Sequence, residues 1–211
     1  MAKLITKFRY LKPTKKRKAG GYATYIATRE GVEKLPSEQK TYADYIATRP
    51  RSQGLFTDAG KDINLRQLSR ELNLYQGNLW TVIISLSRED AERLGFDTAT
   101  RWRDFLRSER SEIAEQFHIP QGNLRWYAAF HNEKHHPHVH LMVWSGDKKE
   151  GYLSEKGIEK LRSSFAKSIF AQDWCNIYDS YTEARNTLRQ ESRERMREII
   201  GAINAGTYEN Q

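Results

Sequence analysis

The sequence predicts an α+β fold in which helices cover an antiparallel sheet and a helical extension follows at the C-terminus. The expected elements run strand, helix, helix, strand, strand, helix, which is not the regular alternation of a parallel α/β sheet. Because that order favours antiparallel pairing, we expect a sheet that carries helices on one side. From Tyr181 onward, apolar residues recur at helical spacing among many charges. We therefore expect a domain over residues 1–180 and a helical extension over 181–211, which either packs on that domain or leads into a further module.

Three elements are expected in the first half of the chain. Residues 4–10 (LITKFRY) have the apolar and β-branched content of a short strand, which the basic run at 12–18 (KPTKKRK) ends. Residues 62–73 place one isoleucine and three leucines mostly at helical spacing and should form a helix. Residues 80–86 (WTVIISL) are rich in β-branched side chains and should form a second strand.

Five further elements are expected after that strand. A serine followed by two acidic residues begins a short helix over 87–95, which ends at a glycine. Residues 98–117 carry apolar side chains at the spacing of one amphipathic helix of about five turns. Residues 124–130 (LRWYAAF) and 138–144 (HVHLMVW) should be strands joined by a polar connector, and residues 154–172 should form a helix.

The composition excludes several classes of protein. The single cysteine, Cys175, excludes an internal disulfide framework and a zinc site built on cysteines. No apolar run approaches the roughly 20 residues that span a bilayer, and the first residues lack the apolar core of a secretory signal. We therefore expect a cytoplasmic protein without a membrane segment. The net charge of +8 and an isoelectric point near 9.5 are common in proteins that bind a polyanion, with a solvated basic surface as the alternative.

A cluster of histidines carries the clearest chemical signal. Five of the six histidines lie between His131 and His140, in HNEKHHPHVH. Because alternate residues of a strand share one face, His138 and His140 should project together as a rigid pair of imidazoles. His131, at the end of the preceding strand, would supply a third nitrogen and leave open positions for a substrate. The cluster predicts a site for a divalent metal, although imidazole nitrogens alone do not choose which one.

The segment FHNEKHHPHVHLMVWS at 130–145 resembles the third motif of plasmid mobilisation relaxases, HUH endonucleases in which two histidines flank one hydrophobic residue. His138-Val139-His140 is similar to that core, and His131 stands where these families place the third metal ligand. WTVIISLSREDAERLGFD, LRWYAAFHNE and EGYLSEKGIEKLRSSFAKSIFAQD also resemble MobP/MobL-type relaxases, so the likeness covers most of the chain. It implies a palm-like sheet, a divalent metal ion (Mn²⁺ or Mg²⁺) on the three histidines, and a DNA-nicking transesterase.

In relaxases the nucleophile is usually a tyrosine near the N-terminus, just after the first strand. The resemblance therefore implies Tyr25, in the first of two YIATR segments, with Tyr22, Tyr42 and Tyr45 as the alternatives. An attacking tyrosine exchanges one phosphodiester for another. The step is close to isoenergetic, so the same site could nick a strand and later rejoin it.

Further contacts to the metal and to DNA are expected nearby. Glu133 should orient a ligand or accept a proton, with a solvated loop carboxylate as the alternative. The cations expected to grip the DNA backbone, each otherwise a surface cation, are Lys15, Lys16, Arg17, Arg29, Arg49 and Arg51. Aromatic rings can stack on the bases of single-stranded DNA, but the three beside the histidines should mostly lie in the core: Trp126, Tyr127 and Trp144.

The expected function is that of a relaxase that initiates conjugative plasmid transfer. Its partners would be transfer-origin DNA, single-stranded at the nick, and other relaxosome and transfer proteins. Rolling-circle replication initiators and transposases share the histidine motif and stay as alternatives, as does a non-catalytic DNA-binding accessory protein with a structural metal. Histidine-triad nucleotide hydrolases also share HPHVH, but they need another histidine where this chain has Met142.

Overall fold

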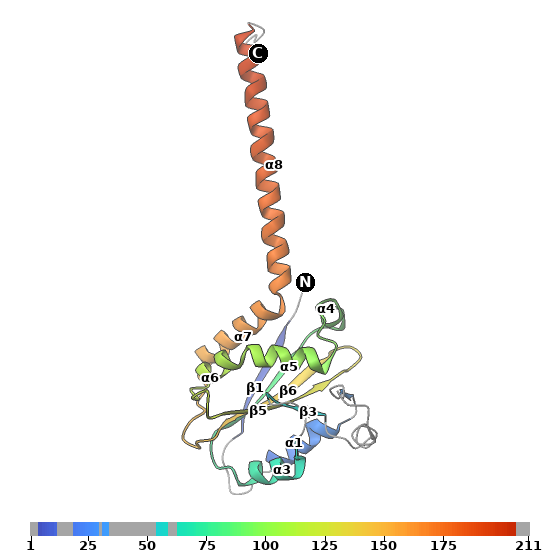
Figure 1. The fold of residues 1–211 in the computed structure, drawn as a ribbon, viewed down its shortest axis with the longest axis vertical. Coiled ribbons are helices and arrows are strands. Elements are labelled where there is room, and N and C mark those ends of the chain that lie inside the picture. Colours follow the sequence, from blue (N-terminus) through green and yellow to red (C-terminus); the bar gives the residue numbers. More distant parts are fainter. Residues whose placement is uncertain (1–3, 12–18, 30, 34–53, 59–62, 206–211) are drawn as a thin grey trace. The chain divides into compact units, whose positions relative to one another are not determined.

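The computed structural model describes residues 4–11, 19–29, 31–33, 54–58 and 63–205, which fall into two units (Figure 1). The first unit ends at Ile169 and contains the sheet with the helices packed on it. The second begins at Phe170 and, as far as it is described, consists of one long helix, α8 (Ala171–Asn204). No helix among the described residues is both long enough and apolar enough to cross a membrane.

Every described strand pairing in the first unit is antiparallel, which confirms the predicted α+β class. The strands lie in the order β1–β4–β6–β5, and the short strands β2 and β3 both pair with β5. Their bounds are β1 (Ile5–Leu11), β2 (Val32–Glu33), β3 (Leu55–Phe56), β4 (Leu79–Ser85), β5 (Leu124–His131) and β6 (His138–Ser145). The four long strands therefore form where β-branched and apolar residues predicted them.

One face of the sheet carries the histidines and is partly covered by two helices. On β6, His138 and His140 share this face with Met142 and Trp144, because side chains alternate along a strand. The helices α1 (Ala19–Thr28) and α3 (Leu65–Leu74) pack on it through a buried apolar cluster, here called the α1–α3 cluster (Figure 1). Its buried members are Ala23, Ile26, Ala27, Leu55, Leu65, Leu68, Leu72, Leu79, Ala129, Met142 and Trp144.

Three helices cover the opposite face of the sheet. They are α5 (Ala99–Ser108), α6 (Arg110–Gln116) and α7 (Glu155–Ile169). Trp102 of α5 packs on Phe130 of β5 with ring centroids 6.0 Å apart, and Phe105 meets Phe165 of α7 at 5.6 Å. The β6 side chains that point into this layer are buried, as expected: Val139, Leu141 and Val143.

The prediction of helices on one side of the sheet is wrong, because each face carries apolar side chains that must be buried. Leu79, Met142 and Trp144 give the histidine face an apolar half that must be buried against another layer. The helices α1 and α3 supply that layer. Trp126 and Trp144 are buried, as the sequence predicted, and they lie on opposite faces of the sheet. Tyr127 stacks on Trp144 with ring centroids 5.5 Å apart.

The single helix expected over 98–117 is two helices, α5 and α6, which meet at Glu109. The Glu109 carboxylate is buried and accepts hydrogen bonds from Ser164 Oγ (2.7 Å) and Ser168 Oγ (2.5 Å) of α7. A buried carboxylate needs such partners. The hydrogen bonds to α7 therefore favour a break at Glu109, although the sequence pattern is that of one continuous helix.

Two other helix boundaries follow from local contacts. The short helix α4 (Arg88–Arg93) begins after Ser87, whose hydroxyl oxygen accepts the Asp90 N–H at 3.1 Å, so the predicted cap is confirmed. The helix expected over 154–172 ends earlier, at Ile169, and α8 begins at Ala171. The domain boundary expected after residue 180 lies within α8 and stays a prediction.

Candidate metal centre

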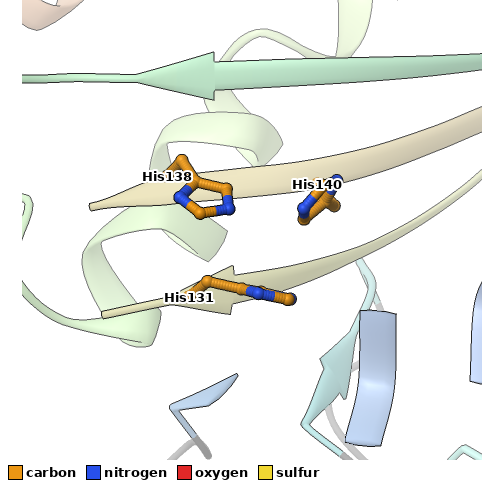
Figure 2. A group of neighbouring side chains, drawn as sticks. All are labelled: His131, His138 and His140. Atoms are coloured by element: carbon orange, nitrogen blue, oxygen red, sulfur yellow. The ribbon is translucent and has the colours of Figure 1, made fainter. Parts of the chain in front are cut away.

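Three histidine side chains converge on the sheet face that α1 partly covers, at the end of β5 and the start of β6 (Figure 2). His131 at the end of β5 pairs directly with His138 at the start of β6, and His140 follows two residues later on the same face. The ring centroids lie 4.7 to 5.1 Å apart, and one nitrogen of each ring lies within 4.8 Å of those of the other two. The sheet therefore brings together the three residues that the sequence proposed as metal ligands.

The outer nitrogen of each ring has a hydrogen-bond partner that orients it. His131 Nε2 donates to the Ile26 carbonyl and His138 Nδ1 donates to the His136 carbonyl, both at 2.9 Å. His140 Nδ1 lies 3.0 Å from the Tyr22 hydroxyl. A carbonyl only accepts, so these contacts place the ring protons of His131 and His138 on the outer nitrogens. Partners of this kind fix the tautomer and the orientation of histidines that bind metals.

The inner nitrogens have no such partner. His131 Nδ1 and His140 Nε2 are buried and make no hydrogen bond with any residue that the structure describes. Leaving buried polar atoms without a hydrogen bond is costly. These two nitrogens therefore call for an ion, a water or a ligand. Three neutral imidazoles facing one another fit a divalent transition metal with open positions for a substrate, and they do not distinguish among such metals.

Burial also keeps these imidazoles in the form that binds metals. It lowers the pKa of His131 to about 4, against the opposing hydrogen bond to Ile26. Burial, helped by the neighbouring histidines, lowers the pKa of His140 to about 3, and burial lowers the pKa of His138 as well. All three rings are therefore neutral at neutral pH, and the carbonyl contacts leave a lone pair on the inner nitrogens of His131 and His138. His140 offers one as well when its Nδ1 donates to the Tyr22 oxygen.

The helix α1 carries two tyrosines on the side of the three histidines, Tyr22 in contact with His140 and Tyr25 beside Arg29. Tyr22 is half-buried, its hydroxyl contacts His140, and burial raises its pKa to about 12. Tyr25, one turn further along, has half of its surface exposed (51%) and lies under the Arg29 guanidinium, whose carbon is 5.8 Å from the ring centroid. Tyr22 is thus engaged with His140, whereas the Tyr25 side chain is open to solvent.

Charged residues tie the connector between β5 and β6 to its neighbours. Arg29 Nη2 lies 3.2 Å from Glu133 Oε1 in a partly exposed ion pair. Arg88 at the start of α4 donates to Asn132 Oδ1 at 2.7 Å, to the Glu133 carbonyl, and to the Lys134 carbonyl at 3.2 Å. The connector that separates His131 from His138 is thereby held from both sides.

Sequence reasoning missed two of these contacts. Nothing local in the sequence sets Arg88 apart from the other surface arginines, because its partners lie 44 to 46 residues away. Tyr22 was considered only as an alternative nucleophile, and its contact with His140 joins residues 118 positions apart. The YIATR segment at 25–29 overlaps the C-terminal turn of α1, but the sequence did not mark it as a helix.

Several proposed site residues fall outside the part of the chain that the structure describes. They are Lys15, Lys16, Arg17, Tyr42, Tyr45, Arg49 and Arg51. Their roles stay predictions. The described residues from the same proposal, Tyr25, Arg29 and Glu133, lie together beside the histidines, joined by the Arg29 contacts.

A comparison with known families gives one match. The model of the family described as MobL relaxases matches residues 40–211, which include the three histidines, β3 to β6 and α3 to α8. No curated protein and no solved structure matches the chain significantly. The matched region begins after α1, so the roles of Tyr22 and Tyr25 depend on their contacts and not on this comparison.

Proposed function

This chain belongs to the MobL relaxase family, and from that premise we propose that it nicks and rejoins one strand of plasmid transfer-origin DNA by metal-dependent transesterification. The observation that carries the proposal is the convergence of three neutral imidazoles, two of which leave a buried nitrogen without a hydrogen-bond partner among the described residues. Such a site is suited to hold a divalent ion beside a phosphodiester. We assign the chain to the HUH endonucleases on the same ground.

The chemistry divides between the ion and the chain. A divalent ion such as Mn²⁺ or Mg²⁺, held by His131, His138 and His140, would neutralise charge on the phosphate oxygens. The Tyr25 oxygen attacks the phosphorus and forms a phosphotyrosine ester, and a deoxyribose oxygen leaves and takes up a proton. One ester bond forms as another breaks, so the reverse attack reseals the strand.

The contacts around Tyr25 support its role as the nucleophile. Its hydroxyl group belongs to an exposed side chain on the helix that also supplies Tyr22 and the Ile26 carbonyl to the histidines. The Arg29 guanidinium beside its ring provides positive charge where a phosphate would approach. Glu133, paired with Arg29, would either accept the tyrosine proton or hold Arg29 in place.

The proposed substrate and setting follow from the same assignment. The substrate is origin DNA, single-stranded at the nick, and the event is the start of conjugative transfer, in the cytoplasm and together with other relaxosome and transfer proteins. The residues proposed to grip the DNA backbone are Arg29 and the cations that lie outside the described residues, Lys15, Lys16, Arg17, Arg49 and Arg51.

The test is incubation of the purified protein with Mn²⁺ and a labelled strand from its transfer origin, followed by a denaturing gel. We expect a covalent protein–DNA adduct with the wild type and none with Tyr25→Phe or in a chelator. An adduct that survives in Tyr25→Phe but is lost in Tyr45→Phe would keep the function and move the nucleophile. Tight DNA binding without an adduct in any variant would favour the accessory-protein alternative.

A further inference from the structure

Two cations on the edge strand β1 lie on the same face of the sheet as the histidines. Leu11 packs on the α1–α3 cluster of that face, and Lys7 and Arg9 share its side of the strand because side chains alternate. The intervening residues point the other way, since the Thr6 hydroxyl accepts a hydrogen bond from Arg162 of α7 at 3.1 Å. Lys7 and Arg9 therefore project beside the metal centre.

The register of the sheet gives their position relative to the histidines. Lys7 pairs with Ile83 of β4, and Ile83 pairs with His140 of β6, so these three residues form one row across the sheet. Arg9 lies in the next row of the same face, opposite Thr81. Two strand spacings separate β1 from β6, which is roughly 10 Å. Long cationic side chains at that distance are within reach of the phosphates next to one held at the histidines.

These cations are available to a ligand. Both side chains are exposed, and neither forms an ion pair with any residue in the described part of the chain. Ile83, which lies between Lys7 and His140, is partly exposed and gives the surface between them an apolar floor. Arg29, in contrast, lies on the α1 side of the histidines and is paired with Glu133. Positive charge thus flanks the metal centre on two sides.

We propose that Lys7 and Arg9 bind the phosphodiester backbone of single-stranded DNA on the β1 side of the nick. The strand would run from the histidines along the row His140, Ile83 and Lys7, with a sugar or base resting on Ile83 and phosphates held at the edge of the sheet. This inference rests on the proposed function, because that function places the reacting phosphate at the histidines. It assigns a DNA contact to β1, which the sequence had marked only as a strand.

The test is the salt dependence of binding to a fluorescein-labelled oligodeoxythymidine, followed by anisotropy in the presence of a chelator. The variant Lys7→Gln/Arg9→Gln is compared with Lys156→Gln/Lys160→Gln, which removes the same charge from exposed positions of α7 on the opposite face. Each lost phosphate contact to a single strand reduces the slope of log K against log salt by about 0.7. The β1 variant loses two such contacts, so we expect its slope to fall by about 1.4. The α7 variant should keep the wild-type slope.

Two outcomes would overturn the proposal: an unchanged slope in the β1 variant, or an equal fall in both variants, which would be a general effect of net charge. Circular dichroism checks that both variants are folded, and Lys7→Arg/Arg9→Lys should keep the wild-type slope because it keeps both charges. Binding in a chelator does not depend on cleavage. The two proposals can therefore fail separately. If the wild type forms no covalent adduct but the β1 variant shows the smaller salt slope, the proposed function is refuted and this DNA contact is supported.

Discussion

Replacement of Tyr22 by phenylalanine tests whether this residue positions a metal ligand or carries out the attack. The substitution removes one hydroxyl, 3.0 Å from His140 Nδ1, and keeps the ring that packs against the α1–α3 cluster. Loss of such an outer partner typically lowers metal affinity 10- to 100-fold, which corresponds to about 1.4 to 2.7 kcal/mol. We therefore expect Tyr22→Phe to need roughly 10 to 100 times more Mn²⁺ than the wild type for half-maximal adduct formation.

The assay is a Mn²⁺ titration of adduct formation, with direct metal binding by calorimetry on the same protein. At saturating Mn²⁺ the variant should form wild-type amounts of adduct, because its tyrosine nucleophile is intact. Tyr10→Phe is the matched control, since it also loses a hydroxyl hydrogen bond, to Asn78 Oδ1 at 2.8 Å, away from the histidines. Unchanged metal affinity in Tyr22→Phe would refute the positioning role, and loss of the adduct at every Mn²⁺ concentration would make Tyr22 the nucleophile.

Three further predictions concern the histidines and their supports. The pKa values of His131 (about 4) and His140 (about 3) lie below their unfolded value of about 6.5, so the metal-free protein should be fully stabilised above pH 6.5 and lose stability as the pH falls toward them. Urea unfolding at several pH values should show a shallower dependence in His140→Gln; an identical dependence would contradict the assigned shift. Arg88→Ala should weaken Mn²⁺ binding because the β5–β6 connector loses three hydrogen bonds. A wild-type Mn²⁺ affinity of this variant, measured by calorimetry, would show that these hydrogen bonds are not needed for metal binding. Glu109→Ala should lower the free energy of unfolding by about 1 to 3 kcal/mol, since Ser164 and Ser168 lose their acceptor, while nicking per folded molecule stays at the wild-type level.

The strands could be predicted from the sequence because their signal is local. The β-branched and apolar runs that became β4, β5 and β6 are continuous, and alternation alone placed His138 and His140 on one face. The place of His131 beside them could be predicted because it ends the strand next to them in sequence, and neighbouring antiparallel strands commonly pair.

The parts that could not be predicted depend on contacts between distant segments. The helix α1 begins with Ala19 followed by two glycines, and glycine is among the poorest helix formers, so α1 is held by its packing on α3 and the sheet. The break at Glu109 depends on two serines of α7 that lie more than fifty residues away. Two of the three outer partners of the histidines, the Ile26 carbonyl and the Tyr22 hydroxyl, come from α1 and leave no pattern in the sequence around the histidines.

The most direct test of the proposed chemistry is to locate the covalent bond to DNA. The adduct formed with Mn²⁺ and the origin strand would be digested with a protease and a nuclease, and the modified peptide identified by mass spectrometry. We predict a nucleotide attached to the Tyr25 oxygen, and no modified peptide when His131, His138 or His140 is replaced by alanine. A nucleotide on any other residue, or a modified peptide that still forms without the histidines, would contradict the account.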